Sequence, residues 1–217
     1  MKVIRFLIIL LTPIVIVLSV VRLMLTPVFI HIEYHMPNFP KDEFGFTLED
    51  RLYWSDVSRQ YLVNDEGIEF LASKTLDDGS PLYNQRELRH MADVKRVVKG
   101  SMTLLVISLV LIVGLGAWAR FSQWWNEYLI SLRQGGMLTI GIIAGVIVFI
   151  ALSFNTFFVG FHRIFFTGDT WLFYYSDTLI RLFPERFWID SFIFISVVSL
   201  LIAGCIVYLV DRRRRIN

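Results

Sequence analysis

The sequence predicts an all-α integral membrane protein built around a bundle of four transmembrane helices. Of its 217 residues, 55% are hydrophobic, and the mean hydropathy is +0.59, which is more apolar than a typical soluble domain. Four apolar stretches each reach the ~20 residues that a helix needs to cross a bilayer core. Lipid offers no hydrogen-bond partners to the backbone, so such stretches must be helical. The predicted spans are residues 1–29, 101–119, 137–161 and 190–210.

The first span is expected to stay in the protein. It opens with Lys2 and Arg5, as a signal peptide would, but its apolar run is too long and no small-residue cleavage site follows it. The remaining segments are predicted to be an extracytoplasmic loop subdomain with a helix leading into the second span, a cytoplasmic loop, an aromatic extracytoplasmic loop and a basic cytoplasmic tail. They cover residues 30–100, 120–136, 162–189 and 211–217, respectively.

The orientation rests on the basic residues near the ends of the spans. Arg212 to Arg215 follow the last span directly, which places the C-terminus in the cytoplasm by the positive-inside rule. With both termini inside, Lys2, Arg5, Arg120 and Arg133 also fall on the cytoplasmic side. The opposing group on the outer side is smaller: Lys95, Arg96, Lys99 and Arg163.

Both outer segments should contain helices. Residues 46–64 carry apolar side chains at helical spacing, and a further helix is expected to begin near Asn84 or Gln85 and to continue into the second span. Between Phe161 and Trp188 the sequence has ten aromatic residues, too many for a freely solvated loop. We therefore expect a short interfacial or re-entrant helix at about residues 169–182, ended before a proline.

Two histidines are the candidate catalytic residues. His90 lies on the helix that leads into the second span, and residues three or four positions away share its face. Those neighbours include Arg86, Glu87 and Asp93, and the carboxylates could orient the imidazole. A solvated, charged helix face would look the same. His162 stands where the third span ends, and Asn155 lies two turns earlier.

Other residues suggest contributions to a site on the same side of the membrane. Asp177 is an acid on an apolar face, and Trp171 could line an acyl pocket or anchor the protein at the interface. His31 and His35 are four residues apart, which would let a helix present both to a metal. The zinc-protease pattern is absent, so packing is the favoured interpretation and no metal is predicted.

The missing motifs narrow the function. The sequence lacks G-x-S-x-G, C-x-x-C, the Walker loop and the Rossmann glycine pattern. Cys205 is the only cysteine, so no intramolecular disulfide is possible, and a net charge of +2 is too small to suggest a nucleic-acid partner. An enzyme with this sequence would use histidine acid–base chemistry.

Two segments resemble a known family. "LYNQRELRHMADVK" and "FHRIFFTGDTWLF", each beside a span in a four-helix chain, resemble the bacterial lipoprotein intramolecular transacylases. The resemblance implies a substrate lipoprotein, anchored among membrane lipids, whose N-terminal cysteine carries S-diacylglyceryl. It implies transfer of the sn-2 acyl chain to the cysteine's own amine, giving the lyso form, with His90 and His162 as the catalytic pair and no cofactor.

The resemblance also implies a location and leaves alternatives. The protein would lie in the bacterial cytoplasmic (inner) membrane with its active site on the extracytoplasmic side. One alternative is a non-catalytic membrane scaffold or chaperone in which the histidines only pack. Another is a metal-dependent membrane hydrolase that uses His31 and His35. A transporter is disfavoured because the spans lack charged residues at their centres.

Overall fold

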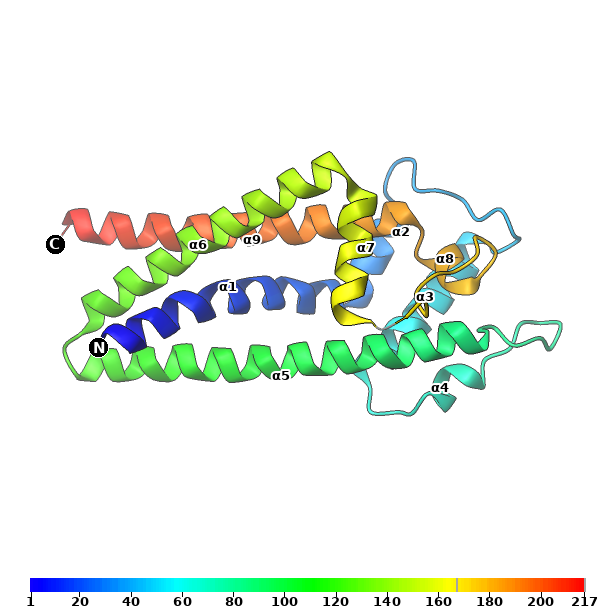
Figure 1. Cartoon of the computed structure of the whole chain (residues 1–217), viewed down its shortest axis with the longest axis horizontal. Helices are drawn as coiled ribbons and strands as arrows, with labels where there is room; N and C mark the ends of the chain where they lie inside the picture. The colour runs from blue at the N-terminus through cyan, green and yellow to red at the C-terminus, as the bar shows by residue number, and fades with distance from the viewer. Residues whose placement is uncertain (167, 217) are drawn as a thin grey trace. The chain divides into compact units, whose positions relative to one another are not determined.

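The computed structural model describes residues 1–166 and 168–216, which form nine helices and no strand. The all-α prediction is confirmed. Four helices, α1, α5, α6 and α9, are long and apolar enough to cross a membrane. The nine helices in Figure 1 are α1 (Lys2–Met24), α2 (Pro27–Tyr34), α3 (Leu48–Val63), α4 (Glu69–Ala72), α5 (Gln85–Phe121), α6 (Trp125–Leu152), α7 (Phe154–Phe165), α8 (Thr178–Leu182) and α9 (Glu185–Ile216).

The chain divides into two compact units. The first unit comprises Met1–Arg22, Ser101–Ser153 and Ile193–Asn217, and the second comprises Leu23–Gly100 and Phe154–Phe192. The predicted aromatic loop 162–189 and tail 211–217 include Thr167 and Asn217, which lie outside the described residues. Both predicted catalytic histidines belong to the second unit.

The first unit holds its helices together by close contact and one ion pair. A Cβ atom added to Gly135 of α6 would lie 2.5 Å from Cβ of Thr12 on α1, so only glycine permits this approach. The Thr12 hydroxyl donates to the carbonyl of Ile8, 2.7 Å away, and is therefore satisfied within its own helix. Nε of Arg133 lies 2.6 Å from Oδ1 of Asp211 and ties α6 to α9.

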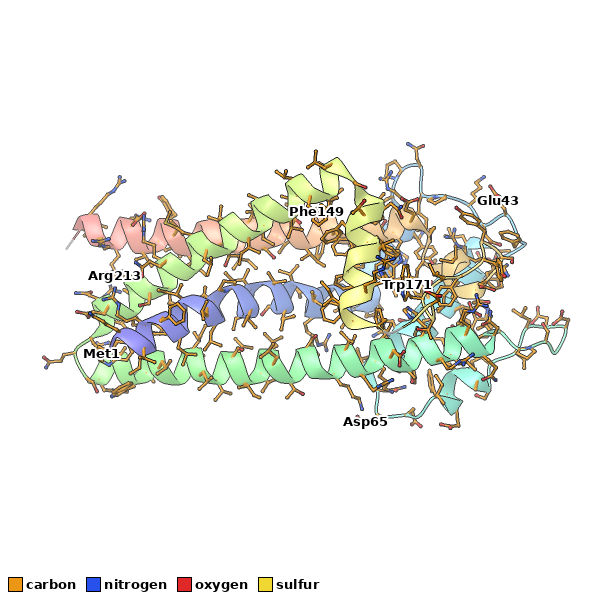
Figure 2. All side chains as sticks on the ribbon, in the orientation of Figure 1. Met1, Glu43, Asp65, Phe149, Trp171 and Arg213 are labelled. Carbon is orange, nitrogen blue, oxygen red and sulfur yellow. The ribbon has the colours of Figure 1, made fainter. Side chains whose placement is uncertain are left out.

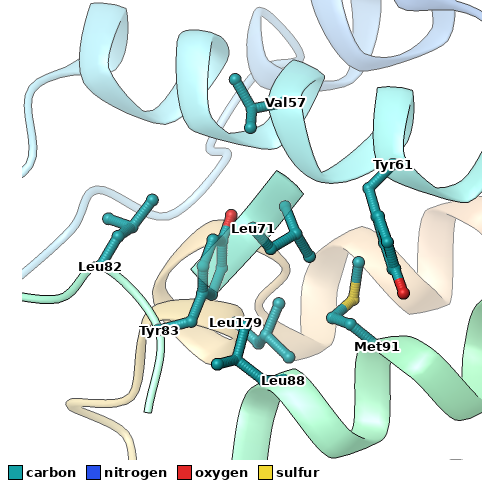
Figure 3. Packing of buried hydrophobic residues seen from close by; sticks show 8 residues of the cluster. All are labelled: Val57, Tyr61, Leu71, Leu82, Tyr83, Leu88, Met91 and Leu179. Carbon is teal, nitrogen blue, oxygen red and sulfur yellow. The ribbon is translucent and has the colours of Figure 1, made fainter. Parts of the chain in front are cut away.

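The second unit has a hydrophobic core between its helices (Figure 3). Val57 and Tyr61 come from α3, Leu88 and Met91 from α5, and Leu179 from α8. Burying side chains of this size contributes about 1.5–3 kcal/mol each. Because Leu88 and Met91 flank position 90 in the sequence, the packing of this core also fixes the part of α5 that carries His90.

Local hydrogen bonds explain where α3 and α5 begin. The Thr47 hydroxyl accepts from the Asp50 N–H at 3.1 Å, and the Asp50 carboxylate accepts from the Thr47 N–H at 2.8 Å. This capping box starts the helix predicted within residues 46–64. Oδ1 of Asn84 accepts from the N–H groups of Arg86 and Glu87, so α5 begins at Gln85 and runs unbroken to Phe121, as expected.

Three elements differ from the expectation. Residues 1–29 were predicted as one span, but α1 ends at Met24 and α2 begins at Pro27. Residues 137–161 were predicted as one span, but α6 ends at Leu152, Ser153 is extended (φ −163°, ψ 97°), and a separate helix α7 follows. The short helix predicted at residues 169–182 covers only Thr178–Leu182. The Asp177 carboxylate accepts from the Tyr174 N–H at 2.9 Å, and this turn replaces the expected first two turns of helix.

Candidate active site

His162 lies in the last turns of α7 and its side chain is only 8% exposed. Its Nδ1 is 2.8 Å from the carbonyl oxygen of Phe158, one helical turn earlier. A carbonyl oxygen can only accept, so Nδ1 must carry a hydrogen. In the neutral ring, the lone pair is then on Nε2. This backbone contact selects the tautomer that can take a proton through Nε2.

Burial keeps the His162 imidazole neutral. Removal of the ring from water lowers the pKa of His162 below its usual value, and the hydrogen bond to Phe158 opposes this shift only in part. A neutral imidazole at physiological pH is the form that can act as a general base.

His90, near the beginning of α5, lies opposite His162. The two ring centroids are 6.2 Å apart and the ring planes are inclined by 19°. His90 is 9% exposed, and its Nδ1 is buried without a hydrogen-bond partner among the described residues. An unpartnered buried imidazole nitrogen close to a second imidazole is available to hydrogen-bond a reacting group.

Both histidines line one cavity of about 140 Å³ within the second unit. Most of the other lining side chains are apolar, and they come from several helices and the loop before α8. Besides the two histidines, the lining includes Arg59, Trp171, Phe158 and Phe173. An apolar cavity with a few convergent polar groups is the usual form of a site for a small or lipid-like ligand.

Trp171 forms one wall of the cavity beside His162. The two ring centroids are 4.9 Å apart, and the indole N–H donates to the Gly168 carbonyl at 3.1 Å. Gly168 has φ +68°, a left-handed conformation that favours glycine and turns the chain after α7. The Trp171 side chain, labelled in Figure 2, is thus returned to the helix that carries His162.

Glu87 and Asp177 support the site without lining the cavity. Glu87 is 1% exposed and accepts from the N–H groups of Asn84 and Leu179, at 2.8 and 2.7 Å. Asp177 accepts from the Asn84 side chain at 3.0 Å. The two carboxylates therefore join the start of α5 to α8. Glu87 was expected to orient His90, but its oxygens are committed to backbone N–H groups.

The other predicted residues lie further from the histidine pair. Arg86 donates to the Leu172 carbonyl at 3.0 Å and so holds the aromatic loop. Asp93 was also expected to orient His90, but it pairs with Arg96 one turn later. Asn155 is exposed and does not line the cavity. Two helical turns, about 10 Å of axis, separate it from His162, which is too far for a hydrogen bond.

His31 and His35 lie together but outside the cavity lining. Their ring centroids are 4.4 Å apart, and Nδ1 of His35 is 2.7 Å from the His31 carbonyl. Within residues 1–166 and 168–216, no group of three or more histidine, cysteine or acidic side chains could hold a metal ion.

Comparison with known proteins identifies the family. A family model described as lipoprotein intramolecular transacylase Lit matches residues 6–188. The chain belongs to this family. The resemblance found in the sequence is therefore confirmed, and the family is one of lipoprotein-modifying, membrane-integral transacylases.

Relatives of this transacylase family include one sequence and several structures. The chain is 31% identical to an uncharacterized protein of Aquifex aeolicus (strain VF5), over 83% of this chain and 80% of that protein. The in meso structure of the membrane integral lipoprotein intramolecular transacylase Lit from Bacillus cereus matches with a TM-score of 0.75 and 19% identity, over 100% of this chain and 98% of that one. A structure of that protein with a histidine-to-arginine mutation matches with a TM-score of 0.68 and 18% identity, over 99% and 93% of the two chains.

Sequence reasoning missed two contributors to the site of this family member. The Phe158 carbonyl fixes the His162 tautomer, and the four-residue spacing on an expected helix was the available signal. Arg59 lines the cavity although nothing in the pattern of α3 distinguishes it from a solvated side chain. Its place depends on a tertiary contact with Leu25, 34 residues away in the chain.

Proposed function

We propose that this protein is an intramolecular transacylase of lipoproteins. Its substrate would be a lipoprotein whose N-terminal cysteine carries S-diacylglyceryl, and the product would be the N-acyl, S-monoacylglyceryl lyso form. The observation that carries the proposal is the pair of buried imidazoles, 6.2 Å apart, in one apolar cavity of a chain from this family.

In the proposed reaction, the cysteine amine nitrogen attacks the carbonyl carbon of the sn-2 ester. A C–N bond forms, and the bond from the carbonyl carbon to the glycerol oxygen breaks. The nitrogen loses one proton and the glycerol oxygen gains one, so the product has an amide and a free hydroxyl. Donor and acceptor belong to one molecule, and orienting them well can contribute about 7–11 kcal/mol in favourable cases.

We assign His162 as the general base. Its Nδ1 is committed to the Phe158 carbonyl, so the Nε2 lone pair is the one available to receive the amine proton. His90 then donates a hydrogen bond to the ester oxygen as negative charge develops, and a proton passes to the departing glycerol oxygen. The unpartnered Nδ1 of His90 supports a direct contact with substrate.

The surroundings of the two histidines suit a lipid substrate. Phe158, Phe173 and Trp171 offer apolar and aromatic walls for acyl chains. We further propose that the site faces the extracytoplasmic side of the bacterial inner membrane. The four arginines after the last apolar segment support that orientation, because cytoplasmic ends are rich in basic residues.

The test uses purified protein and a synthetic S-diacylglyceryl peptide whose sn-1 and sn-2 chains differ in length. Transacylation leaves the intact mass unchanged, whereas hydrolysis removes an acyl chain, so tandem mass spectrometry separates the two reactions. We expect the sn-2 chain on the amine nitrogen. A mixture of isotopically labelled and unlabelled substrates should give no crossed product, because both groups react within one molecule.

His162→Ala and His90→Ala should each lower the rate at least about 100-fold, as expected for loss of acid–base catalysis. His31→Ala is the matched control, because this histidine is exposed and outside the cavity lining. Full product from either cavity variant would remove that residue from the mechanism. No product from the wild-type protein, with the peptide bound, would favour the scaffold alternative.

A further inference from the structure

Among the described residues that line the cavity, Arg59 is the only one whose side chain carries a formal charge at pH 7. It lies on α3, and its side chain is 14% exposed. Placing a guanidinium against apolar walls is costly unless the group is paired or used. Arg59 lines the same cavity as the two candidate catalytic imidazoles, which suggests that a ligand uses it.

Two nitrogens of the guanidinium contact the protein. Nε of Arg59 donates to Oδ1 of Asp56 at 2.7 Å, and Nη1 makes a long contact of 3.4 Å with the Leu25 carbonyl. Asp56 itself is held by Gln60, whose side chain donates to it at 2.6 Å. Because a guanidinium has five N–H donors in a rigid plane, these two contacts leave the remaining donors without an acceptor among the described residues.

The charge balance indicates what those donors would bind. Asp56 neutralises Arg59 but does not line the cavity. The pair therefore offers strong N–H donors with little net positive charge. A neutral carbonyl oxygen suits this arrangement better than a phosphate, which would have to compete with Asp56 for the same cation.

We propose that Arg59 is a substrate-binding residue that donates hydrogen bonds to a carbonyl oxygen of the lipidated cysteine. This inference rests on the proposed function, because an S-diacylglyceryl peptide supplies such oxygens at its two esters and along its peptide. Two of them lie next to the reacting amine and ester: the sn-2 ester carbonyl and the peptide carbonyl of the cysteine. In either case, Arg59 positions the reacting amine and ester between His90 and His162.

The experiment measures binding as well as turnover, so that it does not depend on the reaction. The probes are lipidated peptides with an ether at sn-1, in which the sn-2 ester is replaced by an amide, which keeps the carbonyl, or by an ether, which lacks it. Arg59→Gln should weaken binding of the amide probe about 10- to 100-fold, as expected for a hydrogen bond to a charged group. Arg59→Lys should recover part of that loss, since lysine keeps the positive charge but not the planar set of N–H donors.

The ether probe distinguishes the two carbonyls. If Arg59→Gln weakens binding of the amide probe alone, Arg59 contacts the sn-2 ester carbonyl. With the ester peptide as substrate, the kcat of this variant should then fall more than its KM rises. Weakened binding of both probes assigns it to the peptide carbonyl, where the change should be in KM. Arg96→Gln is the matched control, because Arg96 pairs with an aspartate at the same three-residue spacing but is 80% exposed.

Three outcomes would overturn the inference. In the first, Arg59→Gln and Arg59→Lys bind both probes as the wild type does. In the second, the control variant loses as much binding as Arg59→Gln. In the third, phosphatidylglycerol displaces the amide probe from the wild type and from Arg59→Lys but not from Arg59→Gln, which would make Arg59 a headgroup site. If Arg59→Gln does not fold, Arg59→Lys alone decides. A wild-type protein that binds the amide probe but leaves the corresponding ester peptide unreacted contradicts the proposed function, not this inference.

Discussion

The imidazole Nδ1 of His162 lies 2.8 Å from the carbonyl oxygen of Phe158, and this contact determines which nitrogen of the ring can accept a proton. No side chain is needed for the purpose, since the acceptor is part of the backbone of the same helix. Substitution of Phe158 leaves the carbonyl in place. The tautomer of His162 is therefore insensitive to most mutations around it, and pH is the more informative variable.

We expect a rise in kcat/KM with pH whose lower midpoint is below 6.5. Burial lowers the pKa of His162, so the base is lost to protonation only at a pH below the usual histidine range. The substrate amine, with an ordinary pKa of about 7.7–8.0, adds a second step at higher pH. The measurement is a pH–rate profile with two peptides that differ in amine pKa.

Changing the amine should move only the upper step of that profile. A lower midpoint at or above 6.5, or one that follows the substrate, would show that His162 is not the titrating base. Below pH 6.5 the same shift should also destabilise the fold, because the unfolded chain binds a proton that the folded chain disfavours.

Removal of the Glu87 side chain should destabilise the second unit. In Glu87→Ala, the N–H groups of Asn84 and Leu179 lose a buried acceptor, which should lower the free energy of unfolding by about 2–3 kcal/mol. Thermal unfolding in detergent is the measurement. Glu43→Ala, at an exposed position, is the control and should leave the midpoint unchanged.

Activity should separate the roles of Glu87. The Glu87→Ala protein that remains folded should keep the pH midpoint of the wild type, because Glu87 does not contact His162. A displaced midpoint with unchanged stability would make Glu87 a positioning residue for the imidazoles instead.

Glu33 should make stability decrease as the pH rises. This side chain is 4% exposed, and burial together with a hydrogen bond to Asp190 raises the pKa of Glu33 from 4.5 to about 7. Between those values the folded chain holds a proton that the unfolded chain releases, so folding is favoured on the acid side and the advantage is lost as pH passes 7. Unfolding midpoints from pH 5 to 8 measure the effect.

The variant Glu33→Gln removes this proton, and its midpoint should depend less on pH and exceed that of the wild type at pH 8. Glu43→Gln is the control, and it should keep the wild-type slope. An unchanged slope in Glu33→Gln would show that the proton is bound elsewhere. Arg186, which pairs with Asp190, is the neighbour that limits the effect by stabilising the charged form of Glu33.

The contact between α1 and α6 should not tolerate a side chain. In Gly135→Ala the new Cβ would lie 2.5 Å from Thr12, so one helix must move, at a cost of about 1–3 kcal/mol. Gly141→Ala in the same helix is the matched control, since nothing lies within 4 Å of its Cβ position. Equal unfolding midpoints for the two variants would contradict the close approach.

Hydropathy and the local spacing of apolar residues predicted most of the long helices. Four apolar stretches predicted α1, α5, α6 and α9, because the cost of burying a free backbone in lipid leaves no other form. The break at Ser153 was not predicted, since the residues on both sides of it remain apolar and a hydropathy average does not register the backbone. The length of the short helix was overestimated, because the residues before it form a turn that depends on one side-chain contact, from Asp177 to the Tyr174 N–H.

Part of the cavity lining was predictable. His90 and His162 were singled out because ionisable residues beside spans tend to be functional, and the structure places both in one cavity. Their catalytic role stays a prediction. Arg59 was not found, since a lysine or arginine on an amphipathic helix is ordinarily solvated. The partners of Glu87 were also missed, because its acceptor role depends on Leu179, 92 residues away in the chain.

Ser153 interrupts the helical backbone between α6 and α7. In a continuous helix each inserted residue turns everything beyond it by about 100°. Because the backbone leaves the helical conformation between α6 and α7, the helical register of α6 does not continue into the turns that carry His162. In α5 one helical register runs from His90 to Phe121. A residue inserted between them would therefore rotate the apolar part of α5 relative to His90.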